Sequence, residues 1–456
     1  MTTVVLESTK YIMIVIMALY MLISFVFSHS KWSDESRKHA VRTQRSVIFL
    51  IQLLGALDIF IYTCEIKSLI FFAFEEALFV FILVNFWIFY EDAPGIVINH
   101  MCLLLSIGFI MLQRLDFSLA IRQLAFSAIG AVVIMIIPVF IRRVTVLDKL
   151  RIFYAGAGIA LLAIVLVIGS VSYGAQLSVS FGGISLQPSE FVKIIFAFYL
   201  ASALCSDTEF KNVVKVTIVA ALYVIILVLS KDLGAALIFF FTYLVVLFVS
   251  TGKASYLFAG IFAGALGSVA AYFLFSHVRT RIIAWKDPFS VIDGAGYQVS
   301  QSLFAICSGG FFGTGLFLGY PESIPVVEED FIFSAISEEL GGIFAICLIL
   351  TCVSCFIMFL NIALQIKTRF YKLLALSLGT TYISQVFVMI GGVTKFIPST
   401  GVTLPLVSYG GSSLLSTMMM FAVILGLYMY KESEDEYIQK RKRKEEKRAN
   451  RRRDRS

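Results

Sequence analysis

The sequence predicts an all-α, polytopic membrane protein. Its 456 residues are 59% hydrophobic and only 15% charged, and the mean hydropathy is +0.90. This composition is typical of chains that cross a bilayer many times, and it excludes a soluble two-domain protein. Two further observations support this fold class: the length of the apolar runs, and a bias of lysine and arginine toward every second connection.

Apolar runs long enough to cross roughly 30 Å of hydrocarbon recur along the chain. The first run, residues 11–27, lacks a small-residue cleavage site, so we expect a retained span rather than a removed signal peptide. About thirteen spans are expected, at residues 11–28, 46–63, 68–90, 95–113, 123–140, 152–171, 189–204, 212–229, 233–250, 255–275, 331–360, 370–391 and 402–430.

Lysine and arginine mark the cytoplasmic side of a membrane protein. The most basic segment is the tail, residues 431–456, which we expect to be solvated and cytoplasmic. Basic connections fall on the same side around residues 31–45, 142–151, 211–215, 253 and 367–372. The N-terminus and the other connections, around residues 172–188, 230–232, 276–330 and 391–401, are then expected outside.

The cysteines and histidines do not indicate a metal site. Cys352 and Cys355 form a C-x-x-C pair, but they lie inside an apolar run with no second pair at zinc-finger spacing, so we expect packing residues. The four histidines show no ligand spacing either. We interpret the basic tail as a solvated cytoplasmic segment rather than a nucleic-acid-binding one, so no nucleic-acid partner is predicted.

Residues 400–413, TGVTLPLVSYGGSS, interrupt the apolar sequence near the end of the chain. Three glycines, a proline and five serines or threonines weaken a helix, and exposed backbone is costly in lipid. We therefore expect this segment to be buried in protein or to line a watery cavity, which makes it a candidate site. Close helix packing through small residues is the alternative.

Five motifs follow one another in order: LQPSEFVKI (186–194), KDLGAAL (231–237), DPFSVIDGAGYQVSQSLFAICSGGFFGTGL (287–316), DFIFSAISEELG (330–341) and PSTGVTLPLVSYGGSSLL (398–415). With these motifs the chain resembles the SEDS family, to which FtsW, RodA and SpoVE belong. The resemblance implies a ten-helix core at residues 94–430 with a large extracytoplasmic loop at 276–330. Residues 1–93 would form about three extra N-terminal spans, and 431–456 the tail.

The resemblance also implies a function. Members of this family are peptidoglycan glycosyltransferases that polymerise lipid II at the outer face of the bacterial cytoplasmic membrane, together with a class B penicillin-binding protein, which is a transpeptidase. The acceptor's 4-hydroxyl would attack a lipid-linked glycan and expel undecaprenyl diphosphate with inversion. Such chemistry needs a carboxylate base and cations around the diphosphate. The sequence leaves open whether this glycosyltransferase would act in cell elongation, division or sporulation.

The expected catalytic carboxylate departs from the family pattern. Family members commonly read D-P-x-x-D-P before G-x-G-Y-Q, and the second Asp is usually held to be catalytic. Here Val291 occupies that place, Asp287 matches the first Asp, and Asp293 lies two residues after the vacant position. We therefore expect Asp293 to be the base, with Asp287 as the second candidate.

Substrate-binding residues are expected in the motifs and the outer connections. Two pairs have a simpler alternative, since Lys231 could pair with Asp232, and Glu190 with Lys193 within one helix. A divalent cation, Mg²⁺ or Mn²⁺, would neutralise the diphosphate, although no ligand set identifies one. The candidates are Arg279, Lys395, Asp232, Lys231, Gln298, Glu339, Ser408, Tyr409, Gly410, Gly411, Ser412, Glu190 and Lys193.

Two other functions compete with glycosyl transfer. A flippase or transporter for the same lipid would suit intramembrane charge and broken helices, but no inverted repeat relates the two halves. An inactive scaffold that recruits a transpeptidase is the second, because Val291 replaces the usual Asp.

The charge bias generates a prediction about topology. Accessibility labels at residues 300 and 450 should report opposite faces of the membrane, the first outside and the second cytoplasmic. A label at residue 5 should also report the outside, because the number of spans is expected to be odd. A cytoplasmic label at residue 5 would instead mean that the N-terminal unit has an even number of spans.

Overall fold

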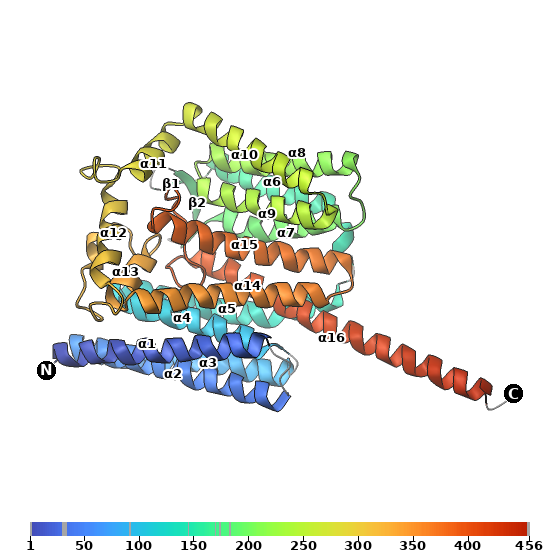
Figure 1. Cartoon of the computed structure of the whole chain (residues 1–456), viewed down its shortest axis with the longest axis horizontal. Coiled ribbons are helices and arrows are strands. Elements are labelled where there is room, and N and C mark those ends of the chain that lie inside the picture. Colours follow the sequence, from blue (N-terminus) through green and yellow to red (C-terminus); the bar gives the residue numbers. More distant parts are fainter. Residues whose placement is uncertain are drawn as a thin grey trace.

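The computed structural model describes residues 2–29, 34–90, 93–144, 146–168, 170–172, 175–181 and 184–453. Long helices run side by side along one direction, and the last of them, α16, extends far beyond the others (Figure 1). The all-α fold class is confirmed. A small sheet was not expected from the sequence: β1 (Ser170–Ser172), β2 (Ala175–Phe181) and β3 (Ile184–Leu186) pair antiparallel in that order, with Val179 opposite Leu186.

Three helices form an N-terminal unit along one side of the bundle (Figure 1). They are α1 (Thr2–His29), α2 (Asp34–Thr63) and α3 (Lys67–Phe89). The core contains ten long helices: α4 (Gly95–Leu115), α5 (Phe117–Arg143), α6 (Arg151–Ile168), α7 (Pro188–Leu204), α8 (Phe210–Leu229), α9 (Leu233–Thr251), α10 (Ala254–Leu274), α14 (Gly342–Gln365), α15 (Arg369–Val393) and α16 (Gly411–Arg453).

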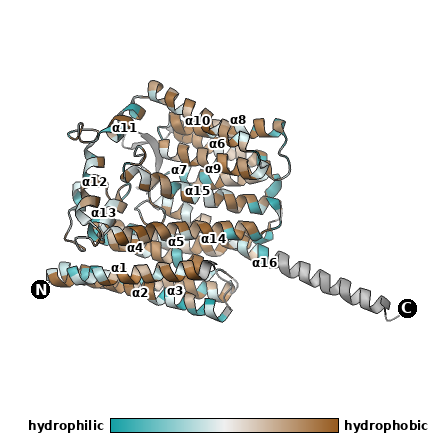
Figure 2. Cartoon of the chain, in the orientation of Figure 1, coloured by the Kyte–Doolittle hydropathy of each residue, from teal (hydrophilic) through white to brown (hydrophobic). Residues whose placement is uncertain are grey.

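The helix lengths fit a bilayer. In the described part of the chain, eleven helices are long and apolar enough to cross a membrane. The shorter α6 and α7, of 18 and 17 residues, complete a set of thirteen. Figure 2 shows hydrophobic residues along these helices and hydrophilic residues gathered toward the two ends of the bundle. Both the ten-helix core and the three preceding helices agree with the sequence-based expectation.

Helix α4 lies at the centre of the packing. Of its apolar window, 89% is buried, whereas α10 at the edge has no buried residue. Helices α5 and α16 pack along each other through small residues. A Cβ added at Gly130 would lie 2.3 Å from the Met418 sulfur, and one at Gly426 would lie 3.0 Å from the Pro138 Cα. The small residues therefore set this close helix contact.

One end of the bundle, which we call the loop end, carries the long connection between α10 and α14 (Figure 1). This connection folds into α11 (Ser276–Lys286), α12 (Tyr297–Gly309), the 3₁₀ turn η2 (Pro321–Ser323) and α13 (Ile332–Glu339). The opposite end, from which α16 extends, is the tail end. There the connections 144–151, 205–210, 251–254 and 366–369 join the helices. Basic residues lie in or directly beside each of them, namely Lys149, Arg151, Lys211, Lys253, Lys367 and Arg369. Basic residues thus gather at one end, as the sequence predicts.

The N-terminal unit supports the loop end directly. Lys10 on α1 donates a 2.8 Å hydrogen bond to the carbonyl of Gly313. Tyr62 at the end of α2 stacks on Phe317, with 4.1 Å between ring centroids. The unit is therefore joined to the connection that carries α11–α13, as well as to the core helices.

Candidate functional site

A buried charged pair lies between α7, α15 and α16. Lys193 donates to the Glu190 carboxylate at 2.7 Å and to the Gln385 side-chain oxygen at 2.6 Å, and the Ser416 hydroxyl donates to Glu190 at 3.0 Å. All four residues are buried. A charge in an apolar interior is tolerated when it is paired and hydrogen-bonded. The intrahelical Glu190–Lys193 pair considered from the sequence is confirmed, and it joins three helices.

Asp232 lies at the start of α9, closer to the loop end. Its carboxylate caps the helix by accepting from the Ala235 backbone N–H at 3.0 Å, and it also accepts from the Ser189 hydroxyl at 3.0 Å. Burial raises the pKa of the Asp232 carboxyl, while these hydrogen bonds work in the opposite direction. Lys231 precedes it at φ 63°, in the left-handed region, with its side chain exposed. Asp232 therefore joins α7 to α9.

The non-helical segment 394–410 connects α15 to α16. Residues 402–413 are buried or half-buried, as expected, whereas Thr394, Phe396 and Gly401 are exposed. Gln385 donates to the Thr403 carbonyl at 3.1 Å, and the Ser408 hydroxyl accepts from the Leu404 backbone N–H at 2.8 Å. The Tyr409 N–H donates to the Glu328 carbonyl at 2.8 Å. Ser412, at the start of α16, accepts from the Gln187 backbone N–H at 2.9 Å. The predicted substrate hydroxyls of Ser408 and Ser412 thus hold the segment in place.

The two adjacent glycines differ in their surroundings. A Cβ added at Gly411 would lie 2.6 Å from the Phe126 ring on α5, so this glycine allows close packing. A Cβ added at Gly410 would meet Thr403 at 3.5 Å and Ser413 at 3.6 Å, which are ordinary contacts. At Gly411 the geometry supports the packing alternative rather than close approach to a substrate.

A second group of charges lies beside residues 399–401. Arg281 on α11 donates to the Ser399 carbonyl at 3.0 Å, and a Cβ added at Gly401 would lie 3.2 Å from an Asp330 carboxylate oxygen. Burial raises the pKa of Asp330 to about 6, and the positive charge of Arg281 opposes this rise. Burial likewise raises the pKa of Glu329 to about 7, with a further contribution from Asp330.

From the sequence, Arg281 and Asp330 belong to the charged residues expected on the outer face, but they were not chosen among the expected site residues. The available signal was the position of Asp330 as the first residue of the DFIFSAISEELG motif. No pattern in the sequence indicated that α11 would place Arg281 against the segment that precedes α16.

The two predicted catalytic aspartates lie in the turn between α11 and α12, at the loop end. Asp287 ends α11, and its carboxylate accepts from the Ser290 backbone N–H at 3.3 Å. Asp293 is exposed, and it has no hydrogen bond or ion pair among the described residues. The Val291 carbonyl accepts from the N–H groups of Gly294 and Gly296, at 3.1 and 3.0 Å. This tight turn leaves Asp293 as the freer carboxylate.

The predicted cations and the remaining polar candidates divide into two groups. Arg279 is exposed and Lys395 half-buried, and neither side chain has a partner in the part of the chain that the structure describes. The Trp285 indole N–H donates to the Lys395 carbonyl at 3.1 Å, which fixes that backbone beside α11. By contrast, Gln298 donates to the Pro325 carbonyl at 2.8 Å, and buried Glu339 pairs with Arg114 at 2.9 Å. The last two stabilise the fold of the loop end.

No ligand set for a divalent cation is present within the described residues. There, no three His, Cys, Asp or Glu side chains form a group that would hold a metal ion. The Mg²⁺ or Mn²⁺ ion considered from the sequence stays a prediction, and no chemical step below depends on it.

Comparison with known proteins assigns the family. Residues 96–433 match the family of FtsW, RodA and SpoVE, described as cell cycle proteins. The chain belongs to this family. The match begins within α4, so α1–α3 precede the region shared with the FtsW/RodA/SpoVE family, and the protein is a multi-pass membrane protein.

Several family members are similar along most of the core. The peptidoglycan glycosyltransferase RodA of Mycobacterium tuberculosis strain H37Rv is 35% identical over 353 residues, which cover 71% of this chain and 75% of that relative. The probable peptidoglycan glycosyltransferase FtsW of Buchnera aphidicola subsp. Schizaphis graminum is 37% identical over 285 residues, which cover 59% of this chain and 78% of that protein.

Solved structures agree with this assignment. The crystal structure of the Thermus thermophilus rod shape determining protein RodA matches 75% of this chain and 98% of its own, with a TM-score of 0.58 and 26% identity. A chain of a peptidoglycan synthase complex that coordinates polymerization and crosslinking matches 75% of this chain and 99% of its own, with a TM-score of 0.65 and 26% identity.

The buried pair generates a prediction about stability. Lys193→Met should destabilise the protein by roughly 3–5 kcal/mol, because it leaves the Glu190 carboxylate without its cation in the interior. The double variant Glu190→Gln/Lys193→Met should lose less stability than the single variant, since neither charge remains in the interior. Thermal unfolding in detergent measures both. Equal losses in the single and double variants would show that the charge pairing is unimportant.

The glycine geometry generates a second prediction. Gly411→Ala should lower the melting temperature and the activity together, since overpacking costs typically about 1–3 kcal/mol. Adding Phe126→Ala should restore part of the stability by removing the clash. Gly267→Ala on α10 is the matched control, with little change in the melting temperature, because a Cβ added there meets no atom within 4 Å. Lost activity at Gly411→Ala with an unchanged melt would instead indicate a backbone that contacts substrate.

Proposed function

We propose that this protein is a peptidoglycan glycosyltransferase that polymerises lipid II into glycan strands at the outer face of a bacterial cytoplasmic membrane. The observation that carries the proposal is the family match over the whole ten-helix core, residues 96–433. The curated relatives named above as glycosyltransferases support the same activity. The long connection at the loop end carries Asp287 and Asp293 together with Arg279, which are the kinds of group that such a reaction needs.

In this proposal the loop end faces outward and the tail end faces the cytoplasm. The basic connections at the tail end support this orientation, since lysine and arginine are retained on the cytoplasmic side. Lipid II polymerisation uses substrate on the outer face, so the catalytic groups must lie at the loop end. Arg279, Asp287 and Asp293 all meet this requirement.

Asp293 acts as the general base of the proposed reaction. It takes the proton from the acceptor's 4-hydroxyl while the oxygen attacks the anomeric carbon of the lipid-linked glycan, and the bond to undecaprenyl diphosphate breaks. Its exposure and its lack of an internal partner leave both oxygens available. Asp287 is the second candidate, because one of its oxygens already accepts from Ser290. Arg279 and Lys395 would offset the developing charge of the diphosphate.

A class B penicillin-binding protein, acting as transpeptidase, is the proposed partner. The support comes from the matching chain in a complex that coordinates polymerization and crosslinking. Glycan strands leave the glycosyltransferase uncrosslinked, so a transpeptidase bound nearby would act on them as they form.

A flippase and an inactive scaffold remain the competing functions. The buried Glu190–Lys193 pair is the intramembrane charge that a flippase would need, but both side chains are engaged across three helices. Purified protein incubated with labelled lipid II separates the three. Polymer formation supports the glycosyltransferase, transbilayer movement alone supports the flippase, and neither supports the scaffold.

The proposed base generates a direct prediction. Asp293→Ala should reduce lipid II polymerisation by roughly 10²- to 10⁴-fold while the melting temperature is unchanged, because an exposed carboxylate contributes little to the fold. Asp287→Ala, six residues earlier on the same segment, is the matched control. Full activity in Asp293→Ala with a dead Asp287→Ala would reverse the assignment, and activity in both would exclude either residue as the base.

A further inference from the structure

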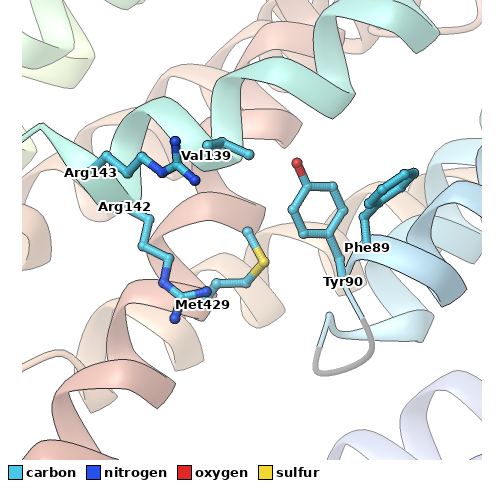
Figure 3. A pocket seen from close by; sticks show the side chains of 6 residues that line it. All are labelled: Phe89, Tyr90, Val139, Arg142, Arg143 and Met429. Carbon is cyan, nitrogen blue, oxygen red and sulfur yellow. The ribbon is translucent and has the colours of Figure 1, made fainter.

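A pocket of about 410 Å³ opens at the tail end, far from the loop end. Its described lining comes from three helices: Phe89 and Tyr90 at the end of α3, Val139, Arg142 and Arg143 in the last turns of α5, and Met429 on α16. Figure 3 shows the guanidinium groups of Arg142 and Arg143 on one side and the rings of Tyr90 and Phe89 on the other. The Tyr90 hydroxyl donates to the Met135 carbonyl on α5. We call this site the tail-end pocket.

Arg142 and Arg143 give the tail-end pocket its positive charge, and no described residue neutralises it. Arg142 and Arg143 are exposed, and within the described chain neither guanidinium has a hydrogen bond or an ion pair. No carboxylate is among the described lining residues. Arginine presents planar donors that suit phosphate oxygens, so two adjacent arginines in a pocket whose described lining is free of acidic residues favour a phosphate-bearing ligand.

The depth of the pocket matches a lipid headgroup. Trp87 and Phe89 are 74% and 68% exposed at the end of α3, and aromatic side chains of this kind gather where the hydrocarbon meets the headgroups. The tail end is also the basic end of the bundle. Anionic lipid headgroups bind in basic pockets between transmembrane helices at this depth.

Exposed apolar side chains lead from the pocket toward the middle of the bundle. Ile88 and Val84 lie one turn apart on α3, and Ile136 and Val132 lie one turn apart on α5. All four are more than two-fifths exposed. A free phosphate would gain nothing from these surfaces, whereas the acyl chains of a phospholipid would cover them.

We propose that the tail-end pocket binds the phosphate headgroup of an anionic phospholipid. Arg142 and Arg143 hold the phosphate, and the acyl chains lie on the exposed faces of α3 and α5. Because Tyr90 and Phe89 belong to the N-terminal unit, whereas Arg142, Arg143 and Met429 belong to the core, the bound lipid joins these two parts. Its binding therefore stabilises the assembled bundle by mass action.

The test compares melting temperatures of the purified full chain in detergent. Cardiolipin and phosphatidylglycerol, added separately, should raise the melting temperature, whereas phosphatidylcholine and inorganic phosphate at equal phosphate concentration should not. Arg142→Gln/Arg143→Gln should need roughly tenfold more anionic lipid for the same shift, or show none. An equal shift with phosphatidylcholine would overturn the proposal, and an equal shift with inorganic phosphate would reassign the pocket to a free anion.

Two further variants separate the pocket from the general charge of this face. Lys211→Gln/Lys215→Gln removes two positive charges from the tail end of α8 and should keep the lipid-induced shift. Val139→Trp fills the pocket without changing the charge and should abolish the shift. Loss of the shift in the Lys211/Lys215 variant, or its full retention in Val139→Trp, would show that no lipid is seated in the pocket.

Discussion

The polar groups that the bundle must bury determine most of its architecture. Glu190 and Lys193 lie among apolar helices, where an isolated charge would cost several kcal/mol. Gln385 on α15 and Ser416 on α16 complete their hydrogen bonds. Helices α7, α15 and α16 must therefore place these side chains at the same depth in the membrane, and each helix must be rotated so that its polar residue faces the other two. The same requirement brings Ser189 on α7 to Asp232 at the start of α9. These bonds specify which helices are neighbours, which apolar packing alone leaves open.

The break between α15 and α16 depends on this network. Only the first residues of segment 394–410 bond back to α15, so most of its other backbone N–H and C=O groups need partners outside a helix, and lipid offers none. Gln385 reaches from the charged pair to the Thr403 carbonyl, while Ser408 closes the turn onto Leu404. The hydroxyls of Ser408 and Ser412, which the sequence indicated as substrate ligands, therefore bind backbone N–H groups of the protein itself. Residues 399–401 lie instead beside Arg281 and Asp330.

The sequence predicted the helices well and the site only in part. Apolar runs and the lysine and arginine bias give span number and grouping, because both follow from the membrane itself. The Glu190–Lys193 pair could be predicted, since its spacing is local. The Arg281–Ser399 bond could not, because 118 positions separate its partners and no periodicity relates them. The sheet at residues 170–186 was missed although β2, AQLSVSF, alternates apolar and polar residues over its whole length, because residues 172–188 were taken as a plain connection between two spans.

The N-terminal unit is integrated in the bundle by the same kind of bond. Tyr20 on α1 shares a 2.7 Å hydrogen bond with His100 on α4, and His100 shares a 2.9 Å bond with Ser354 on α14. All three residues are buried, so this chain crosses from the added helices through the centre of the family core. Lys10 extends the attachment to the loop end through Gly313. A movement of α1–α3 would have to break these bonds in an apolar interior, where no water replaces them. The three helices therefore form a rigid support for the connection that carries Asp287 and Asp293. A lipid bound between α3 and α5 would stabilise the same three helices at the tail end.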